Sequence, residues 1–238
     1  MNKQTAGDPM TPPPANPSQD FIGFAVETGV LKFGEFRTKA GRLSPYFFNA
    51  GLFNDGASLG RLAGFYAQRL LQAEAESGRR FDMLYGPAYK GIALASSMAV
   101  ALASQGRNLP FAFNRKEAKD HGEGGSVIGA PLSGQVMIVD DVISAGTSVG
   151  ESVTLIESQG ARPAGVLIAL DRMERGGDAV HVAGNSAVQQ VRERYGLPVY
   201  AIATLDDLLA FLDKHAPSDE SHTAHRIRIA DYRRRFGT

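Results

Sequence analysis

At 238 residues, the chain is long enough to bury one sizeable core, or one domain with appendages. Its 25 Lys and Arg balance its 25 Asp and Glu, so it has no global field to attract nucleic acid or a membrane surface. The absence of cysteine excludes disulfides, thiolate catalysis and Cys-ligated metals, and it fits a reducing cytoplasm. No apolar run reaches the ~20 residues that span a bilayer. We therefore expect a cytoplasmic protein with neither a nucleic acid nor a membrane as partner.

The first 20 residues hold five of the twelve prolines and no apolar core, so we expect a disordered tail rather than a secretory signal. A single domain should follow over residues 21–238, with Ser18 or Asp20 capping its first helix. In chain order, periodicity and turn residues predict a helix at 21–30, a hairpin at 33–50, a helix at 57–75, a strand at 81–85, a helix at 91–104, a strand at 109–113, a polar stretch at 115–134, a strand at 136–139, a helix at 149–159, a strand at 164–170, a loop or insertion at 178–185, a helix at 187–195, a strand at 199–204, a helix at 205–215 and a helical tail at 226–236.

Strands that alternate with helices predict an α/β fold with a doubly wound, mainly parallel sheet. In such sheets ligands bind at the carboxyl ends of the strands. Four polar segments follow the ends of predicted strands and can share one pocket. They are residues 86–90, the stretch from 115 onward, residues 140–148 and residues 171–172. The N-terminal hairpin is extra to this plan, and we expect it to form a hood, about residues 21–55, over the pocket.

The segment 136–148 carries the strongest chemical pattern. A buried apolar strand ends at two adjacent carboxylates, Asp140 and Asp141, and a loop of small residues leads into a helix. Thr147 and Ser148 can cap that helix, whose free N–H groups point into the loop and favour an anion. No Gly-Lys-Thr follows as in a Walker loop, so the loop suits one terminal phosphate, and the carboxylates can bind two ribose hydroxyls or help to place a divalent cation. The pattern indicates a ribose 5-phosphate site; an ordinary turn with solvated carboxylates is the alternative.

A cationic segment follows the predicted strand at 109–113. Three cations and a histidine fall between Arg115 and His121, and the glycines after them disfavour a stable helix or strand. A mobile loop, about residues 115–129, can bring positive charge to a departing polyanion and exclude water. The alternative is a solvated surface loop.

Three shorter patterns complete the set. Phe47 and Phe48 would alternate faces on a strand, so that one ring packs on the core and the other meets a flat ligand. The link at 86–91 joins a strand to a helix start, which is a second anion site. Arg172 follows a strand and can pair with a carboxylate through its guanidinium fork. Core packing of both rings and a surface ion pair of Arg172 with Asp171 are the alternatives.

These motifs resemble those of a known family. Residues 139–148 resemble the phosphoribosyl pyrophosphate (PRPP) signature of the type I phosphoribosyltransferases, although Ser144 stands where the family often has Thr. Residues 115–122 are similar to the Arg-Lys-x-x-Lys-x-His-Gly catalytic loop of the orotate phosphoribosyltransferases, and residues 39–49 resemble their hood. The resemblance covers residues 21–236 and implies the type I phosphoribosyltransferase fold. The proline-rich tail and a longer region at 176–187 depart from it.

The resemblance implies an enzyme of pyrimidine biosynthesis that converts orotate and PRPP into orotidine 5′-monophosphate and pyrophosphate. It implies Mg²⁺ as cofactor, held mainly through substrate and water near Asp140 and Asp141 rather than by a metal-ligand set of the protein. It also implies a homodimer in which the loop of one subunit closes over the site of the other, with Lys116 reaching into the partner's site. A PRPP-binding regulator of transcription, favoured only by the basic tail at 226–235, and a transferase for another base are the alternatives.

The residue roles that the resemblance implies are as follows. Catalytic residues would be Lys116, Lys119, His121, Asp140 and Asp141. PRPP would be bound by Lys39, Tyr89, Lys90, Arg115, Lys116, Lys119, His121, Asp140, Asp141, Val142, Ile143, Ser144, Ala145, Gly146, Thr147 and Ser148. Orotate would be bound by Phe47, Phe48, Ser144 and Arg172.

Overall fold

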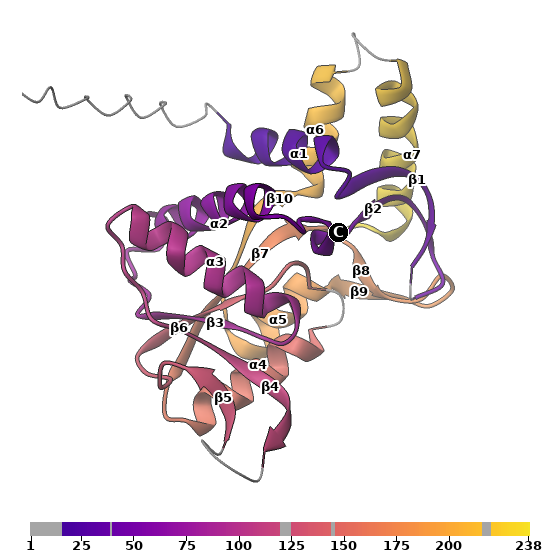
Figure 1. Cartoon of the computed structure of the whole chain (residues 1–238). Coiled ribbons are helices and arrows are strands. Elements are labelled where there is room, and N and C mark those ends of the chain that lie inside the picture. The colour runs from indigo at the N-terminus through magenta and orange to yellow at the C-terminus, as the bar shows by residue number, and fades with distance from the viewer. Residues whose placement is uncertain (1–15, 39, 120–124, 144–145, 216–219) are drawn as a thin grey trace, which may run out of the picture.

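A six-stranded sheet in the order β10-β7-β6-β3-β4-β5 forms the centre of the molecule (Figure 1). The computed structural model describes residues 16–38, 40–119, 125–143, 146–215 and 220–238, with the backbone alone at 117–119 and 125. The strands are β1 (Leu31–Arg37), β2 (Leu43–Phe48), β3 (Met83–Gly86), β4 (Phe111–Lys119), β5 (Gly125–Gly129), β6 (Gln135–Val139), β7 (Arg162–Asp171), β8 (Arg175–Gly177), β9 (Val182–Ser186) and β10 (Val199–Thr204). The helices are α1 (Pro17–Glu27), the short 3-10 helix η1 (Ala50–Leu52), α2 (Gly56–Ser77), α3 (Lys90–Ser104), α4 (Thr147–Ser158), α5 (Ala187–Tyr195), α6 (Leu205–His215) and α7 (Glu220–Phe236).

The sheet is parallel except for its edge strand β5, which pairs antiparallel with β4. The chain passes from β3 to β4 on one side and later returns to β6 on the other, so the strand order reverses between β3 and β6. This reversal is a topological switch point, where ligands of such sheets bind. The predicted doubly wound, mainly parallel sheet is confirmed.

Two apolar cores lie on opposite faces of the sheet. Successive side chains of β6 alternate between them: Met137 and Val139 belong to the core under α1, α2, α3 and α6, while Val136 and Ile138 belong to the core under α4 and α5. Because both faces of β6 are covered, its sequence is a continuous apolar run. This double coverage explains why the strand was predictable from composition alone.

The hood consists of the antiparallel β1–β2 hairpin with α1, and α7 packs against β2 (Figure 1). Helix α1 begins at Pro17, and the side chain of Asn16 caps it by accepting the N–H of Gln19. The predicted caps Ser18 and Asp20 are therefore wrong, since both lie inside the helix. Residues 1–15 of the expected tail lie outside the described residues.

The segment expected to be free of strands at 115–129 is a hairpin in its described part. Strand β4 runs on to Lys119 and pairs with β5. Gly129 has φ 106°, and a Cβ there would lie 2.4 Å from the carbonyl oxygen of Phe111. Glycine thus permits this close strand approach instead of preventing strand formation. Residues 120–124 lie outside the described residues, and mobility of the loop stays a prediction.

The region expected as a loop at 178–185 also forms a short hairpin, β8–β9. Asp178 accepts the N–H groups of Val180 and His181 at its turn, both at 2.7 Å. The buried side chain of Arg42 holds the hairpin from the hood by donating to three carbonyl oxygens, those of Arg175, Gly176 and Asp178. Within the described ranges, no helix is long and apolar enough to cross a membrane.

Candidate active site

The carboxyl ends of β3 and β6 meet at the switch point, and two glycines allow this. A Cβ on Gly86 would lie 2.0 Å from the carbonyl oxygen of Gly91, and a Cβ on Gly91 would lie 2.9 Å from that of Val139. Real Cβ atoms do not come this close to backbone, so both positions require glycine for packing reasons. The link between β3 and α3 is thereby pressed against the residues that follow β6.

Two carboxylates follow β6 and have different surroundings. Asp141 is buried and pairs with Lys90, whose Nζ lies 2.5 Å from Oδ2. Asp140 accepts the hydroxyl of Ser148 at 3.0 Å and the backbone N–H of Asp141 at 2.9 Å. The hydroxyl of the buried Tyr66 donates to the carbonyl oxygen of Asp140 at 2.7 Å. These contacts hold both carboxylates in fixed positions. Fixed acceptors are what specific recognition of two ligand hydroxyl groups requires.

Burial raises the pKa of Asp140 to about 6, and the neighbouring charge of Asp141 adds to this shift. The ionised form of Asp140 is therefore less favourable than in water, since like charges lie side by side at a partly enclosed position. A ligand that donates hydrogen bonds to this carboxylate would relieve part of that cost.

Among the described residues, the backbone donors in the first turn of α4 have no side-chain cap. Gly146 precedes the helix with φ 71°, a left-handed conformation that suits glycine. The expectation that Thr147 or Ser148 caps α4 is wrong, because both lie within the helix and Ser148 instead donates to Asp140. The uncapped N–H groups and the positive end of the helix dipole can bind a phosphate beside the carboxylates.

The link after β3 contacts polar and cationic residues of the neighbouring strand β4. The N–H of Ala88 donates to the side chain of Asn114 at 2.7 Å. The ammonium of Lys116 lies 5.1 Å from the centre of the Tyr89 ring, a cation–π contact. Tyr89 is 71% exposed, so its ring and Lys116 form an accessible cationic edge of the site.

Arg172 follows β7 and reaches the hood. Its Nε lies 3.0 Å and its Nη2 2.6 Å from Oε1 of Glu174, and its guanidinium lies over the Tyr46 ring at 5.1 Å. Burial lowers the pKa of Arg172, but Tyr46 and Glu174 raise it by more, so the guanidinium stays charged. The side chain is 24% exposed, which leaves part of it accessible to a ligand.

The two adjacent phenylalanines divide as alternation on a strand predicts. Phe48 is buried and packs 6.3 Å from the ring of Phe21. Phe47 is 43% exposed and stacks on Phe36 at 5.4 Å. Phe47 is consequently the ring available to a flat ligand, and the ring of Phe48 belongs to the core.

The described residues contain no group of three His, Asp or Glu side chains arranged to hold a metal ion. Of the two candidate carboxylates, Asp141 is engaged by Lys90. This set fits a Mg²⁺ ion held through substrate oxygens and water with one or two carboxylates, since Mg²⁺ keeps several of its waters. It does not fit a cage made of protein side chains alone.

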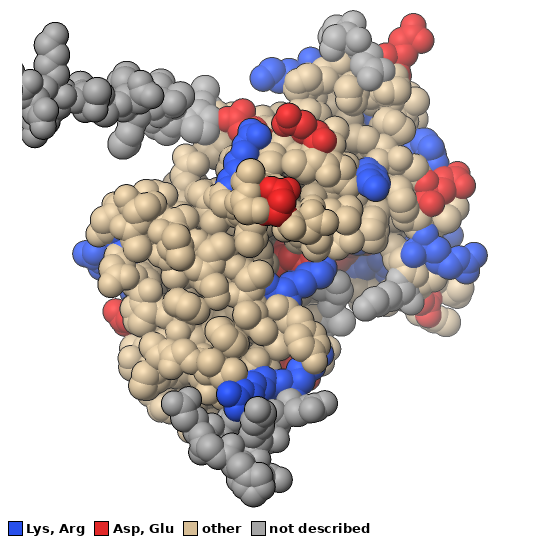
Figure 2. Space-filling view, in the orientation of Figure 1, with Lys and Arg blue, Asp and Glu red and all other residues tan. Residues whose placement is uncertain are grey.

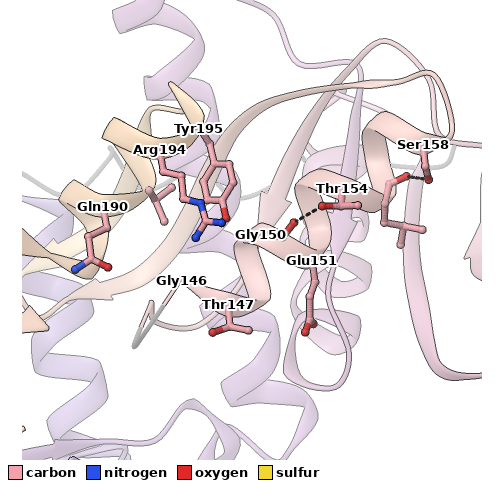
Figure 3. Close-up of a pocket in the computed structure, with 11 residues that line it drawn as sticks. Gly146, Thr147, Gly150, Glu151, Thr154, Ser158, Gln190, Arg194 and Tyr195 are labelled. Carbon is pink, nitrogen blue, oxygen red and sulfur yellow. Dashed lines mark hydrogen bonds between the residues drawn. The ribbon is translucent and has the colours of Figure 1, made fainter. Parts of the chain in front are cut away.

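A cavity of about 620 Å³ lies between α4 and α5 (Figure 3). Gly146 and Thr147, at the start of α4, line it, but neither Asp140 nor Asp141 does. In Figure 3 the Tyr195 ring stands over Gly150, and a Cβ added to Gly150 would lie 2.4 Å from the Tyr195 hydroxyl. The cavity therefore does not include the carboxylate pair.

The structure thus brings together Tyr89, Lys90, Lys116, Asp140 and Asp141, with the start of α4 beside them. Lys39, His121, Ser144 and Ala145 lie outside the described residues, and of Lys119 the backbone alone is described. Arg115 is partly buried, and Val142 and Ile143 pack against the two cores. Tyr66, Asn114 and Glu174 were missed by the sequence analysis. Its position directly after the strand predicted at 109–113 could have singled out Asn114, whereas Tyr66 looks like any core residue of an apolar stripe.

A family model described as "Phosphoribosyl transferase domain" matches residues 54–188, so fold and site define a phosphoribosyltransferase. The orotate phosphoribosyltransferase of Ralstonia nicotianae is 64% identical over 219 residues, 92% of this chain and 94% of that protein. That of Cupriavidus metallidurans is 60% identical over 237 residues and covers 100% of both chains. The crystal structure of the Francisella tularensis orotate phosphoribosyltransferase superposes with a TM-score of 0.78 at 37% identity, over 92% of this chain and 100% of that one. The chain belongs to the orotate phosphoribosyltransferase family.

This membership confirms the predicted enzyme class and reaction, the transfer of a phosphoribosyl group from PRPP to orotate in pyrimidine biosynthesis. The basic tail, which was the one feature in favour of a nucleic-acid-binding regulator, is largely neutralised. Acidic side chains lie beside its cations at the right of Figure 2. Four of its arginines form ion pairs, Arg226 with Asp213, Arg228 with Glu35, Arg233 with Asp206 and Arg234 with Asp231.

Proposed function

We propose that the residues at the switch point bind PRPP, that Arg172 and the hood bind orotate, and that Mg²⁺ and a second subunit complete each site. The observation that carries this proposal is the uncapped start of α4 beside the Asp140–Asp141 pair. An anion-binding helix terminus next to two hydroxyl acceptors matches a ribose 5-phosphate.

The phosphate of PRPP accepts hydrogen bonds from the first turn of α4. Asp140 and Asp141 accept the two ribose hydroxyls. Lys90, which is half exposed and already paired with Asp141, extends toward the diphosphate, and the exposed ring of Tyr89 lies beside it. Positive charge is thereby placed where negative charge develops as the C1–O bond breaks.

Orotate differs from uracil by one carboxylate, and a guanidinium fork matches that group. We assign this contact to Arg172 and assign the exposed ring of Phe47 to the face of the base. As the C1–O bond breaks and pyrophosphate leaves with the bonding electron pair, the ring nitrogen of orotate forms a bond to C1 of the ribose and gives up its proton to the departing diphosphate or to water. The protein supplies no covalent nucleophile, and its contribution is orientation and stabilisation of an oxocarbenium-like transition state.

When bound, Mg²⁺ neutralises the diphosphate and orients it. The residues that would hold it are Asp140 and Asp141, through water or the ribose hydroxyls. We infer a homodimer in which Lys116 acts in the partner's site. A cytoplasmic location is supported by the lack of cysteine and by the reaction class.

Orotate consumption, followed by absorbance, tests the assignment. Turnover should require both PRPP and Mg²⁺, and adenine, hypoxanthine and uracil should be inactive in parallel reactions. Turnover of another base in preference to orotate would overturn the assignment of Arg172. PRPP binding without turnover of any base would favour a regulator instead.

A further inference from the structure

We infer that Glu174 is a positioning residue for base recognition: it orients the guanidinium of Arg172, and the hydroxyls of Tyr46 and Tyr232 hold Glu174 in place. This inference rests on the proposed contact between Arg172 and the carboxylate of orotate. Oε1 of Glu174 accepts from Arg172 and from the Tyr46 hydroxyl at 3.1 Å, and Oε2 accepts from the Tyr232 hydroxyl at 3.3 Å. Both oxygens are thus bound within the protein.

One edge of the guanidinium is occupied and another is available. Glu174 takes the edge formed by Nε and Nη2, through a single oxygen. Among the hydrogen bonds between described residues, none uses Nη1, and Nη2 has besides Glu174 a contact of 3.4 Å with the Ser44 hydroxyl. A planar carboxylate can pair with the remaining edge, formed by Nη1 and Nη2. Glu174 therefore determines which edge faces the substrate.

The backbone between Arg172 and Glu174 is built to bring their side chains together. Met173 has φ 50°, which is uncommon for a residue with a side chain and requires support from its surroundings. Asp171 accepts the N–H of Met173 at 2.8 Å. On the other side, the N–H and the hydroxyl of Thr238 donate to the carbonyl oxygen of Met173 at 2.9 and 3.2 Å. The strained turn is therefore fixed from both sides.

The cluster joins three parts of the fold. Tyr46 comes from hood strand β2, Glu174 follows sheet strand β7, and Tyr232 comes from α7, with the two tyrosine rings edge to face at 6.5 Å. Burial raises the pKa of Tyr46 far above its usual range, so its hydroxyl stays a donor. The side chains of Arg172 and Glu174 are 24% and 15% exposed, so water competes little with their contact.

The direction of the effect distinguishes positioning from mere proximity. As an anion near the substrate's carboxylate, Glu174 by itself repels orotate. If charge alone mattered, Glu174→Gln would improve orotate binding. If orientation dominates, as we propose, the same substitution impairs it, because the guanidinium then rotates about its side-chain bonds.

The experiment compares orotate and PRPP kinetics of the full-length Glu174→Gln enzyme, which keeps the shape of the side chain and its acceptor oxygen. We expect kcat/KM for orotate to fall about tenfold, the scale of a charged hydrogen bond, with the KM for PRPP unchanged. In the Arg172→Ala background the same change should have no further kinetic effect, because Glu174 acts through Arg172. Two results would overturn the inference. One is a double variant whose kcat/KM for orotate falls by the product of the two single-variant losses, and the other is a lower KM for orotate in Glu174→Gln.

Glu35→Gln is the matched control, since it removes a second glutamate that joins the hood to α7, through Arg228 at 3.0 Å. Its orotate kinetics should equal those of the parent protein. If Glu174→Gln does not fold, Tyr232→Phe replaces it, with an expected rise of about threefold in the KM for orotate, and an unchanged value would refute the inference. Failure of the parent protein to use orotate would instead refute the proposed function.

Discussion

Lys90 and Asp141 form an ion pair across the switch point of the sheet, with 2.5 Å between Nζ and Oδ2. In the described part of the chain, no ion pair reaches the neighbouring Asp140. Two adjacent carboxylates therefore have different roles in the free protein: one is neutralised, and the other has a pKa raised to about 6. The surface between sheet and hood is hollowed, with acidic and basic side chains along it (Figure 2).

Asp140→Asn should weaken PRPP binding and stabilise the fold at high pH. With the folded pKa above its unfolded value of 3.8, the folded protein binds a proton between about pH 4 and pH 6 that the unfolded chain does not. The free energy of unfolding therefore increases as the pH falls through about 6 and Asp140 becomes protonated. Above about pH 6, the ionised Asp140 destabilises the fold. The asparagine variant should be about 1–3 kcal/mol more stable at pH 8. This advantage should shrink as the pH falls through about 6 and vanish below the unfolded pKa of 3.8, as measured by thermal unfolding.

Asp178→Asn is the control with the opposite sign. The backbone N–H groups of His181 and Val180 hold the pKa of Asp178 below its usual value, so its ionised form supports the fold above that range. This variant should be less stable than the parent at pH 8.

Unchanged steady-state kinetics of both Asp140→Asn and Asp141→Asn would contradict the ribose assignment.

Gly91→Ala should damage the PRPP site, whereas Gly60→Ala should not. A Cβ on Gly91 would meet backbone and Pro87 at 2.7–2.9 Å, which forces the link after β3 away from β6. We expect a loss of about 1–3 kcal/mol in stability and a raised KM for PRPP. Gly60 lies in α2 with nothing within 4 Å of the added carbon, so alanine there should stabilise by about 0.5–1 kcal/mol. Equal effects in denaturant unfolding would show that packing at the switch point is unimportant.

Sites shared between subunits predict complementation. Lys116→Ala and Asp140→Asn should each be nearly inactive, yet a mixture that exchanges subunits should recover about a quarter of the parent activity, since one site of each mixed dimer has neither lesion. Activity is measured after mixing and checked against native mass spectra for mixed dimers. Mixed dimers without activity would show that Lys116 acts in its own subunit, where it already contacts Tyr89.

Arg172→Ala should lower kcat/KM for orotate about ten- to a hundred-fold, which corresponds to about 1.5–3 kcal/mol for a shielded charged hydrogen bond. PRPP binding alone should stay near that of the parent. Because the change leaves the partly buried Glu174 without its cation, stability should fall as well and must be measured separately. Arg172→Lys should recover only part of the activity, since it keeps the charge but not the fork. Equal losses for orotate and PRPP would move base recognition to another residue, Lys39 being the next candidate.

Much of the fold was predictable because its signals are local. Strands such as β6 are continuous apolar runs, and their carboxyl ends share one edge of a parallel sheet, so Lys90 and Asp141 could be expected to meet. The cap of α4 could not be predicted, because Ser148 bonds to Asp140 across the loop rather than to its own helix. The pairing of β4 with β5 was not predicted, because glycine usually disfavours strands. Gly129 is instead needed there, since a side chain would collide with the backbone of Phe111, and composition does not show such a contact between strands. The partners of Arg172 could not be foreseen either, since Tyr46 and Tyr232 lie far from it in sequence.

The turn at Met173 has a consequence for how the site assembles during folding. The PRPP half depends on contacts within the central part of the chain, such as Lys90 with Asp141, whereas the base half needs Tyr46 and also Tyr232 and Thr238 from α7 and the residues after it. Long loops must close before such distant contacts form, so the base half should be acquired last. We expect pulse-labelling hydrogen exchange during refolding to protect β3 and β6 before the backbone at Met173. A folding intermediate would then bind PRPP before it could recognise orotate.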